Sequence, residues 1–176
     1  MKKLLLLFAL FSFVFSVDAQ KLEGTFKADI GAGYAKPTEG FGVKPGVTLV
    51  AEPHYYLSDN FTVGVRFEGA FLGYQAQYDD ELFSFFGSTT LTGDYYFAKG
   101  KIKPFLGMGG GLFTRHYILE DSSGEDLYTS GYGTIKLGFL GRMGLEAGHI
   151  RVTGTYNVIG ANFSYVAFTV GYVIGE

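Results

Sequence analysis

The segment Thr134–Val158 reads TIKLGFLGRMGLEAGHIRVTGTYNV, and its pattern predicts the fold of the chain. Bulky apolar residues alternate with polar or small ones along Thr134–Glu146. After a break at Ala147-Gly148, the alternation resumes along Ile150–Val158. A period of two places successive side chains on opposite faces of a β-strand. Two such strands joined by a tight turn predict a β-hairpin.

These two strands are long, and their polar faces carry charge of both signs. Soluble strands average about 5 to 6 residues, whereas a tilted strand that crosses a bilayer needs about 9 to 11. Both strands reach that second length, and Lys136, Arg142, Glu146 and Arg151 lie on their polar faces among small residues. We therefore expect an inside-out arrangement, in which the apolar face contacts lipid and the charged face lines a lumen.

The same alternation recurs in six further segments, separated by connections that are alternately long and short. This spacing is typical of an up-and-down meander with both termini at the short-turn, periplasmic end. The sequence therefore predicts an all-β fold, an eight-stranded antiparallel up-and-down transmembrane β-barrel. The expected strands are 22–34, 47–57, 61–71, 83–97, 102–115, 134–146, 150–158 and 165–174.

The first 19 residues have the features of a secretory signal peptide. Lys2 and Lys3 precede the apolar run Leu4–Val17, and the small residue Ala19 suits a cleavage site before Gln20. We therefore expect residues 1–19 to be a signal peptide and residues 20–176 to form the barrel domain. Retention of this segment as an N-terminal anchor is the alternative.

The composition argues against nucleic acid as a partner and against stabilisation by disulfides. Loss of Lys2, Lys3 and Asp18 with the signal peptide leaves 12 of 14 Lys and Arg and 16 of 17 Asp and Glu, a net charge of −4. Surfaces that bind nucleic acid are basic. The chain has no cysteine, so an exported domain of this size depends on strand pairing and packing.

A soluble lipocalin-like barrel would also show alternation, so alternation alone does not tell which face is outside. The composition of the polar face distinguishes the two arrangements. That face holds nearly equal numbers of acids and bases, separated by glycine and threonine. Buried charges must be paired, which suits a narrow lumen lined by both signs. The expected lumen charge network is Glu23, Lys27, Asp29, Glu52, Arg66, Glu68, Asp94, Arg115, Lys136, Arg142, Glu146 and Arg151. The expected lipid-facing residues are Phe26, Ile30, Leu49, Val63, Phe67, Leu91, Leu137, Phe139, Val152, Phe168, Val170 and Tyr172.

The signal peptide, the Gly138–Arg151 hairpin and the aromatic C-terminal strand together resemble small outer-membrane β-barrels of the OmpA/OmpX type. The resemblance implies a location in the outer membrane, contact with outer-membrane lipid and insertion by the barrel-assembly machinery. Barrels of that type usually end on an aromatic residue that this machinery reads. Here the chain ends on Gly175-Glu176, so the insertion signal is expected to be imperfect or to lie at Tyr172.

The long connections are the segments expected to meet an extracellular partner. They are 35–44, 73–82 and 116–130, and the last two contain the acidic runs Asp79–Glu81 and Glu120–Asp126. We interpret these runs as solvated loop charge, because they lack the spacing of a calcium loop. Gly107–Gly111 lies within a strand, which favours close packing over phosphate binding. No metal or cofactor site is therefore expected.

An eight-stranded interior is just filled by side chains, which favours a plugged lumen over the first alternative, a small or gated channel. The expected function is therefore a structural or surface-interaction role for a monomeric barrel. A lipid-modifying enzyme with a catalytic His and Ser at the outer rim is the second alternative, and a soluble carrier of an apolar ligand is the third. The candidate residues for catalysis are His54, His116, His149, Ser84 and Ser164. We expect no enzymatic activity, because His54 and His149 lie near the periplasmic turns and His116 has no accompanying motif.

Overall fold

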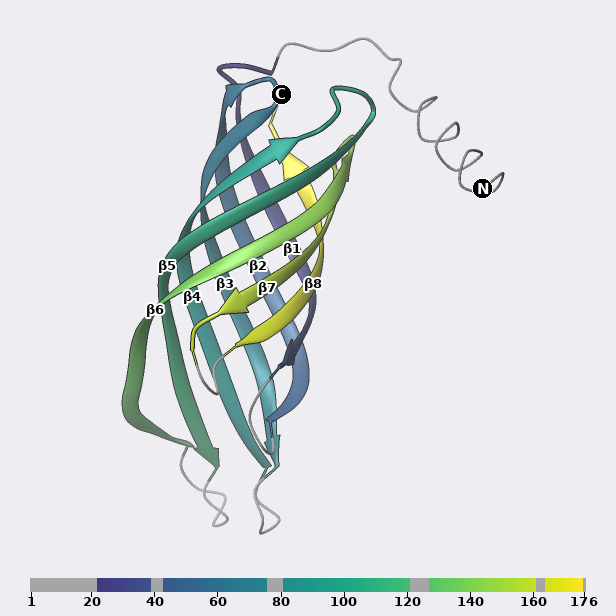
Figure 1. The fold of residues 1–176 in the computed structure, drawn as a ribbon. Coiled ribbons are helices and arrows are strands. Elements are labelled where there is room, and N and C mark those ends of the chain that lie inside the picture. The colour runs from purple at the N-terminus through teal and green to yellow at the C-terminus, as the bar shows by residue number, and fades with distance from the viewer. Residues whose placement is uncertain (1–21, 39–42, 76–80, 121–126, 161–163, 176) are drawn as a thin grey trace, which may run out of the picture.

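The computed structural model describes residues 22–38, 43–75, 81–120, 127–160 and 164–175. Eight strands form one closed barrel in which each strand pairs antiparallel with its neighbours in sequence, and β8 closes on β1 (Figure 1). The predicted fold class is confirmed. The strands are β1 (Phe26–Pro37), β2 (Val43–Ser58), β3 (Phe61–Gln75), β4 (Glu81–Tyr96), β5 (Ile102–Glu120), β6 (Leu127–Ala147), β7 (Ile150–Val158) and β8 (Tyr165–Ile174).

The β6–β7 hairpin forms where the sequence predicts it. Glu146 lies opposite Arg151, and Ala147 lies opposite Ile150, so only Gly148 and His149 connect the strands. Gly148 has φ +60°, the left-handed conformation that a two-residue hairpin turn requires and that glycine adopts without steric cost. This turn, the other short turns and the C-terminus lie at the same end of the barrel, which we call the turn end (Figure 1).

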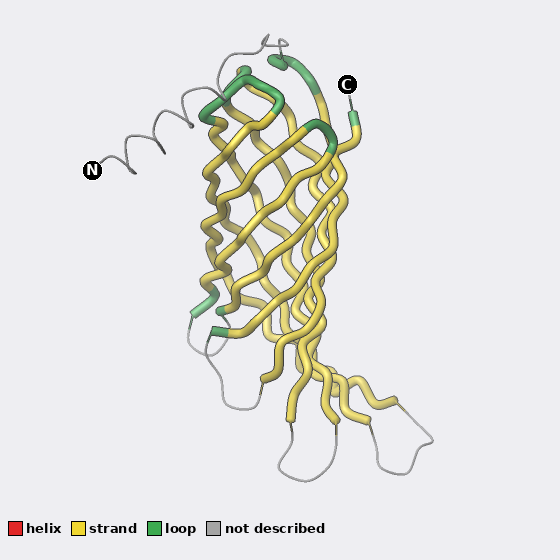
Figure 2. Tube along the Cα trace, turned by 90° about the vertical axis from the view of Figure 1, so that its right-hand side faces the viewer, coloured by secondary structure: helices red, strands yellow, loops and turns green. Residues whose placement is uncertain are grey.

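The expected loops 35–44, 73–82 and 116–130 are wrong in their bounds, because the strands on either side continue into them. The connecting segments are only 38–42, 76–80 and 121–126. A strand that leaves the membrane needs no alternation, since its backbone still pairs with its neighbour while both side-chain faces meet water. We call the opposite end, where β1 leads to β2, β3 to β4 and β5 to β6, the loop end. The ribbon shows β3 to β6 extending there beyond β7 and β8 (Figure 1), and the tube shows strand ends that project beyond the rest of the barrel at this end (Figure 2). β1 also begins later than expected, because Leu22–Thr25 form a turn closed by a bond from Thr25 N to Leu22 O (2.9 Å).

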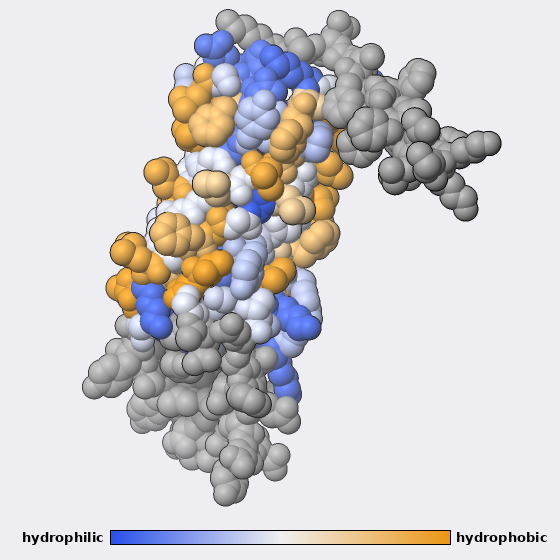
Figure 3. Space-filling model, in the orientation of Figure 1, coloured by the Kyte–Doolittle hydropathy of each residue, from blue (hydrophilic) through white to orange (hydrophobic). Residues whose placement is uncertain are grey.

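Apolar side chains cover the outside of the barrel, and polar ones fill the inside. Every strand carries large, exposed apolar residues on its outward face, from Phe26 on β1 to Ile174 on β8. The space-filling view shows apolar side chains along the wall and hydrophilic residues at the turn end (Figure 3). Two apolar clusters lie inside. One contains Leu22, Tyr56, Tyr96 and Phe105, and the other contains Ala35, Ala70, Leu72, Phe86, Phe113, Ile159, Tyr165 and Ala167.

Two inward glycines make room for buried carboxylates. A Cβ built at Gly107 would overlap the carboxylate of Asp94, and one built at Gly171 would overlap that of Asp29. Glycine at these positions therefore lets charged groups occupy the narrow lumen. Within the described residues, no helix has the length and hydrophobicity that crossing a membrane demands.

Candidate functional site: a buried charge network in the lumen

Arg142 on β6 is the centre of the buried network. Its guanidinium donates to both carboxylate oxygens of Glu52 on β2, at 2.5 and 2.6 Å, and to both oxygens of Asp94 on β4, at 2.8 Å each. All three side chains are at most 3% exposed. Such forked, charge-assisted contacts are among the strongest hydrogen bonds in proteins. Arg142 therefore joins opposite walls of the barrel.

Arg151 on β7 extends the network toward β1. It donates to Asp94 Oδ2 at 2.5 Å and to the Tyr96 hydroxyl at 3.3 Å, and its Nε lies 3.8 Å from Asp29 Oδ2. The guanidinium also lies 4.2 Å from the centroid of the Phe105 ring. Because Asp94 contacts both Arg142 and Arg151, one carboxylate links the two cations.

Arg66 on β3 extends the network in the other direction. Its Nε donates to Glu68 Oε2 at 3.1 Å, and its Nη1 lies 3.4 Å from Glu52 Oε2. The hydroxyls of Thr48 and Tyr165 both donate to Glu68 Oε1, at 3.2 Å. Neutral donors thus complete the coordination of a carboxylate that has a single arginine partner in this cluster.

Lys103 on β5 and Glu146 on β6 form a separate pair nearer the turn end. Lys103 Nζ lies 2.5 Å from Glu146 Oε1, and the Tyr96 hydroxyl donates to Glu146 Oε2 at 2.9 Å. The two residues are directly opposite in the β5–β6 register. Tyr96 contacts Glu146 and Arg151, so it connects this pair with the central network.

The network holds most of the residues that the sequence predicts for the lumen. Asp29, Glu52, Arg66, Glu68, Asp94, Arg142, Glu146 and Arg151 lie in it. Lys27 approaches the Tyr56 ring at 5.9 Å, and Arg115 lies 4.9 Å from the Phe86 ring, toward the loop end. Lys136 faces inward on β6, half-buried and beyond the cluster. Glu23 lies outside the lumen, since it is exposed in the turn before β1.

Alternation places Lys103, Tyr96 and Tyr165 on the polar face, and the structure confirms that facing. The expected charge network does not include them. Strand alternation gives the face of a side chain but not its partners, so the hydrogen bonds of the two tyrosines to Glu146 and Glu68 could not be predicted. The expected lipid-facing residues all lie on the outward face, and Val63 and Val152 are the two that are only half-exposed.

The residues considered for catalysis do not come together. His54 is buried in the lumen beside the Glu52 carbonyl (3.3 Å), and His149 in the β6–β7 turn stacks on Tyr172 of β8. His116 lies on the outer wall, 6.5 Å from the Phe85 ring. Ser164 bonds to its own β7–β8 connection, where it accepts from Ile159 N at 3.3 Å.

No group of three or more His, Asp or Glu among the described residues could hold a metal ion. Of the acidic runs noted in the sequence, Asp79, Asp80 and 121–126 lie outside the residues that the structure describes.

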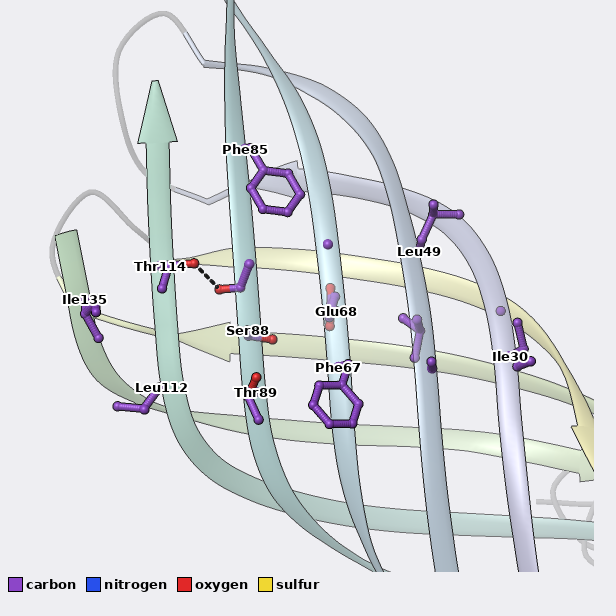
Figure 4. Close-up of a pocket in the computed structure, with 15 residues that line it drawn as sticks. Ile30, Leu49, Phe67, Glu68, Phe85, Ser88, Thr89, Leu112, Thr114 and Ile135 are labelled. Atoms are coloured by element: carbon purple, nitrogen blue, oxygen red, sulfur yellow. Dashed lines mark hydrogen bonds between the residues drawn. The ribbon is translucent and has the colours of Figure 1, made fainter. Parts of the chain in front are cut away.

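Several hollows of the described chain open on its outer wall. One, of about 690 Å³, spreads over neighbouring strands from β1 to β6 (Figure 4). Outward Ile30, Leu49, Phe67, Phe85 and Leu112 surround it, and a bond from Thr114 Oγ1 to Gly87 O (3.3 Å) crosses its floor. The exposed apolar side chains around this hollow suit contact with lipid.

Comparison with known proteins identifies the fold. No protein-family model matches the chain, and no curated protein matches it. Among solved structures, Neisserial surface protein A matches with a TM-score of 0.66 and 17% identity, over 88% of this chain and 100% of that one. OprG from Pseudomonas aeruginosa matches with a TM-score of 0.59 and 16% identity, over 92% and 100%.

Ail of Yersinia pestis, solved in complex with the heparin analogue sucrose octasulfate, matches with a TM-score of 0.53 and 13% identity, over 86% of this chain and 99% of that one. All three identities are low, so these similarities establish the architecture and leave the role of the chain open. The chain has the fold of small eight-stranded outer-membrane β-barrels.

Proposed function

We propose that the chain is an integral outer-membrane β-barrel with a structural or surface-interaction role, whose lumen is closed by paired charges. The observation that carries this proposal is the reversal of the usual distribution of polarity. Arg66, Glu52 and Arg142 are at most 3% exposed, whereas Leu137 on the outer wall is 78% exposed. In water this arrangement would expose a continuous apolar surface far larger than a soluble monomer tolerates.

The lumen network supports a plug in preference to a channel. Arg142 crosses the lumen from β6 to carboxylates on β2 and β4, and an ion passing through would have to displace those contacts. We infer that the wild-type barrel does not conduct ions in a planar bilayer. Stable conductance of purified protein would support the alternative, a small or gated channel.

The surface-interaction role belongs to the loop end. The four strands β3 to β6 extend there beyond β7 and β8 (Figure 1), which supports a role in contact with an extracellular partner. Replacement of 121–126 by a Gly-Ser linker should leave barrel assembly intact and weaken adhesion of cells that display the protein. Unchanged adhesion would assign the protein a structural role only.

We also propose that the chain has no enzymatic activity. The separation of His54, His116 and Ser164 supports this, since a nucleophile and its base must lie within hydrogen-bond reach. Hydrolysis of phospholipid or lipid A by purified protein would contradict it.

The proposed location requires export and insertion into the membrane. We propose that residues 1–19 are removed as a signal peptide and that the barrel-assembly machinery inserts the rest of the chain. Sequencing of protein from the membrane fraction should give Gln20 as the first residue. Detergent dependence and a heat-dependent shift in gel migration test the barrel itself. Protein that stays dispersed in buffer without detergent would refute the membrane location and support a soluble barrel.

A further inference from the structure

We propose that a groove on the outer wall of β4–β7 binds an acyl chain of a phospholipid in the periplasmic leaflet, with the lipid phosphate at the β4–β5 turn. The groove has a volume of about 960 Å³. This inference rests on the proposed membrane location and extends it, because it assigns one lipid a fixed position on the barrel.

The groove exists because outward positions on three strands lack side chains. Gly93 on β4 lies opposite Met108 on β5, which in turn lies opposite Gly141 on β6, while Gly154 lies on β7. A Cβ at Gly141 would meet no atom within 4 Å, and one at Gly154 would meet only Met143 O at 3.9 Å. Neither glycine has a positive φ. Packing and backbone conformation therefore do not require glycine at these two positions.

The walls of the groove suit an acyl chain. Phe61, Tyr95 and Phe97 lie toward the turn end, and Met108 and Met143 flank the glycines. Methionine side chains are flexible and adapt to the shape of an apolar partner. All lipid tails are equally apolar, so a preferred position comes from many weak dispersion contacts along a matching shape. A groove supplies such contacts on several sides, whereas a convex wall supplies them on one.

Charge at the end of the groove identifies the lipid. β4 and β5, which carry the groove, are joined by a turn with two exposed lysines, Lys99 and Lys101. Lys99 pairs with Asp59 at 3.0 Å, and no interaction of Lys101 occupies its ammonium group among the described residues. This turn lies at the turn end of the barrel (Figure 1). The proposed membrane location places the headgroups of the periplasmic leaflet beside this end. A phosphate there would meet a cation while its acyl chain enters the groove.

Native mass spectrometry of the full chain tests the proposal. The protein is released from detergent after mixing with phosphatidylglycerol, and the fraction that retains one lipid is measured. The double variant Gly141→Leu/Gly154→Leu fills the groove and should lower this fraction about fivefold. Ala32→Leu is the matched control, because it adds the same side chain to an exposed outward position on β1, and it should retain lipid like wild type.

A second pair of variants tests the phosphate contact. Lys101→Gln should weaken retention of phosphatidylglycerol without affecting retention of a diacylglycerol with the same chains, and Lys36→Gln at the loop end should change neither. Heat-dependent gel migration verifies that each variant folds. Equal retention by wild type, the glycine variant and the control would overturn the proposal, as would wild type that retains no lipid. A wrong membrane location would give a different result, namely wild-type protein that remains dispersed without detergent.

Discussion

Replacement of Arg142 by methionine keeps much of the side-chain length and removes the cation that joins Glu52 to Asp94. The variant loses four hydrogen bonds and leaves two buried carboxylates without their shared partner. Removal of one member of a buried ion pair costs about 3 to 5 kcal/mol. We expect the lower end, about 3 kcal/mol, because Asp94 keeps Arg151 and Glu52 keeps a weaker contact with Arg66.

Equilibrium unfolding in urea from lipid vesicles, followed by circular dichroism, measures this loss. The double variant Arg142→Met/Glu52→Gln should lose less stability than the sum of the losses of the two single variants. Each single change leaves its partner as an unpaired buried charge, and the second change removes that charge. We expect a coupling energy of about 1 to 3 kcal/mol. Lys36→Met, on the exposed wall, is the control and should change stability by less than about 0.5 kcal/mol. A loss below about 1 kcal/mol for Arg142→Met, with additive single changes, would refute the account of the network.

Three further predictions concern the wall, the lumen and the turn end. Leu137→Asp places a charge on the lipid face and should lower the yield of heat-modifiable protein in vesicles, and normal insertion would contradict the assigned facing. Gly107→Ala forces the Asp94 carboxylate to move, so urea unfolding should show a loss of about 1 to 3 kcal/mol, and an unchanged midpoint would show that the lumen has spare room. Hydrogen bonds from Lys99 and from two backbone amides lower the pKa of Asp59 below its usual 3.8. The stability from this group is present above pH 3.8 and is lost as pH falls through the lowered pKa, so Asp59→Asn should flatten that part of a pH titration of the unfolding midpoint.

The fold could be predicted from the sequence because a membrane barrel imposes a strict period on each strand. A shift of one residue along β6 would turn Arg142 and Glu146 toward lipid and Leu145 toward the lumen. Only one assignment of the two strand faces to lipid and lumen is therefore compatible with the sequence. The same constraint is absent beyond the membrane, which explains why the loop ends of β3 to β6 extend further than the alternation indicates.

The partners within the lumen could not be predicted to the same extent. Lys103 and Glu146 are neighbours in the strand register, so their pairing follows once the register is known. Arg142 and Glu52 are 90 residues apart and come from strands that do not pair with each other. Their contact depends on the tilt and closure of the whole barrel, which no local pattern encodes.

The central claim is that lipid surrounds the apolar wall and that the polar face is sealed inside. The chain has no cysteine, so single-cysteine variants carrying a spin label in lipid vesicles test it directly. Leu91→Cys and Val152→Cys should be accessible to oxygen dissolved in the lipid, whereas Thr90→Cys and Thr153→Cys should be shielded from both oxygen and a water-soluble nickel reagent. Access of the nickel reagent to the labels at Leu91 and Val152, with oxygen reaching Thr90 and Thr153 instead, would contradict the account.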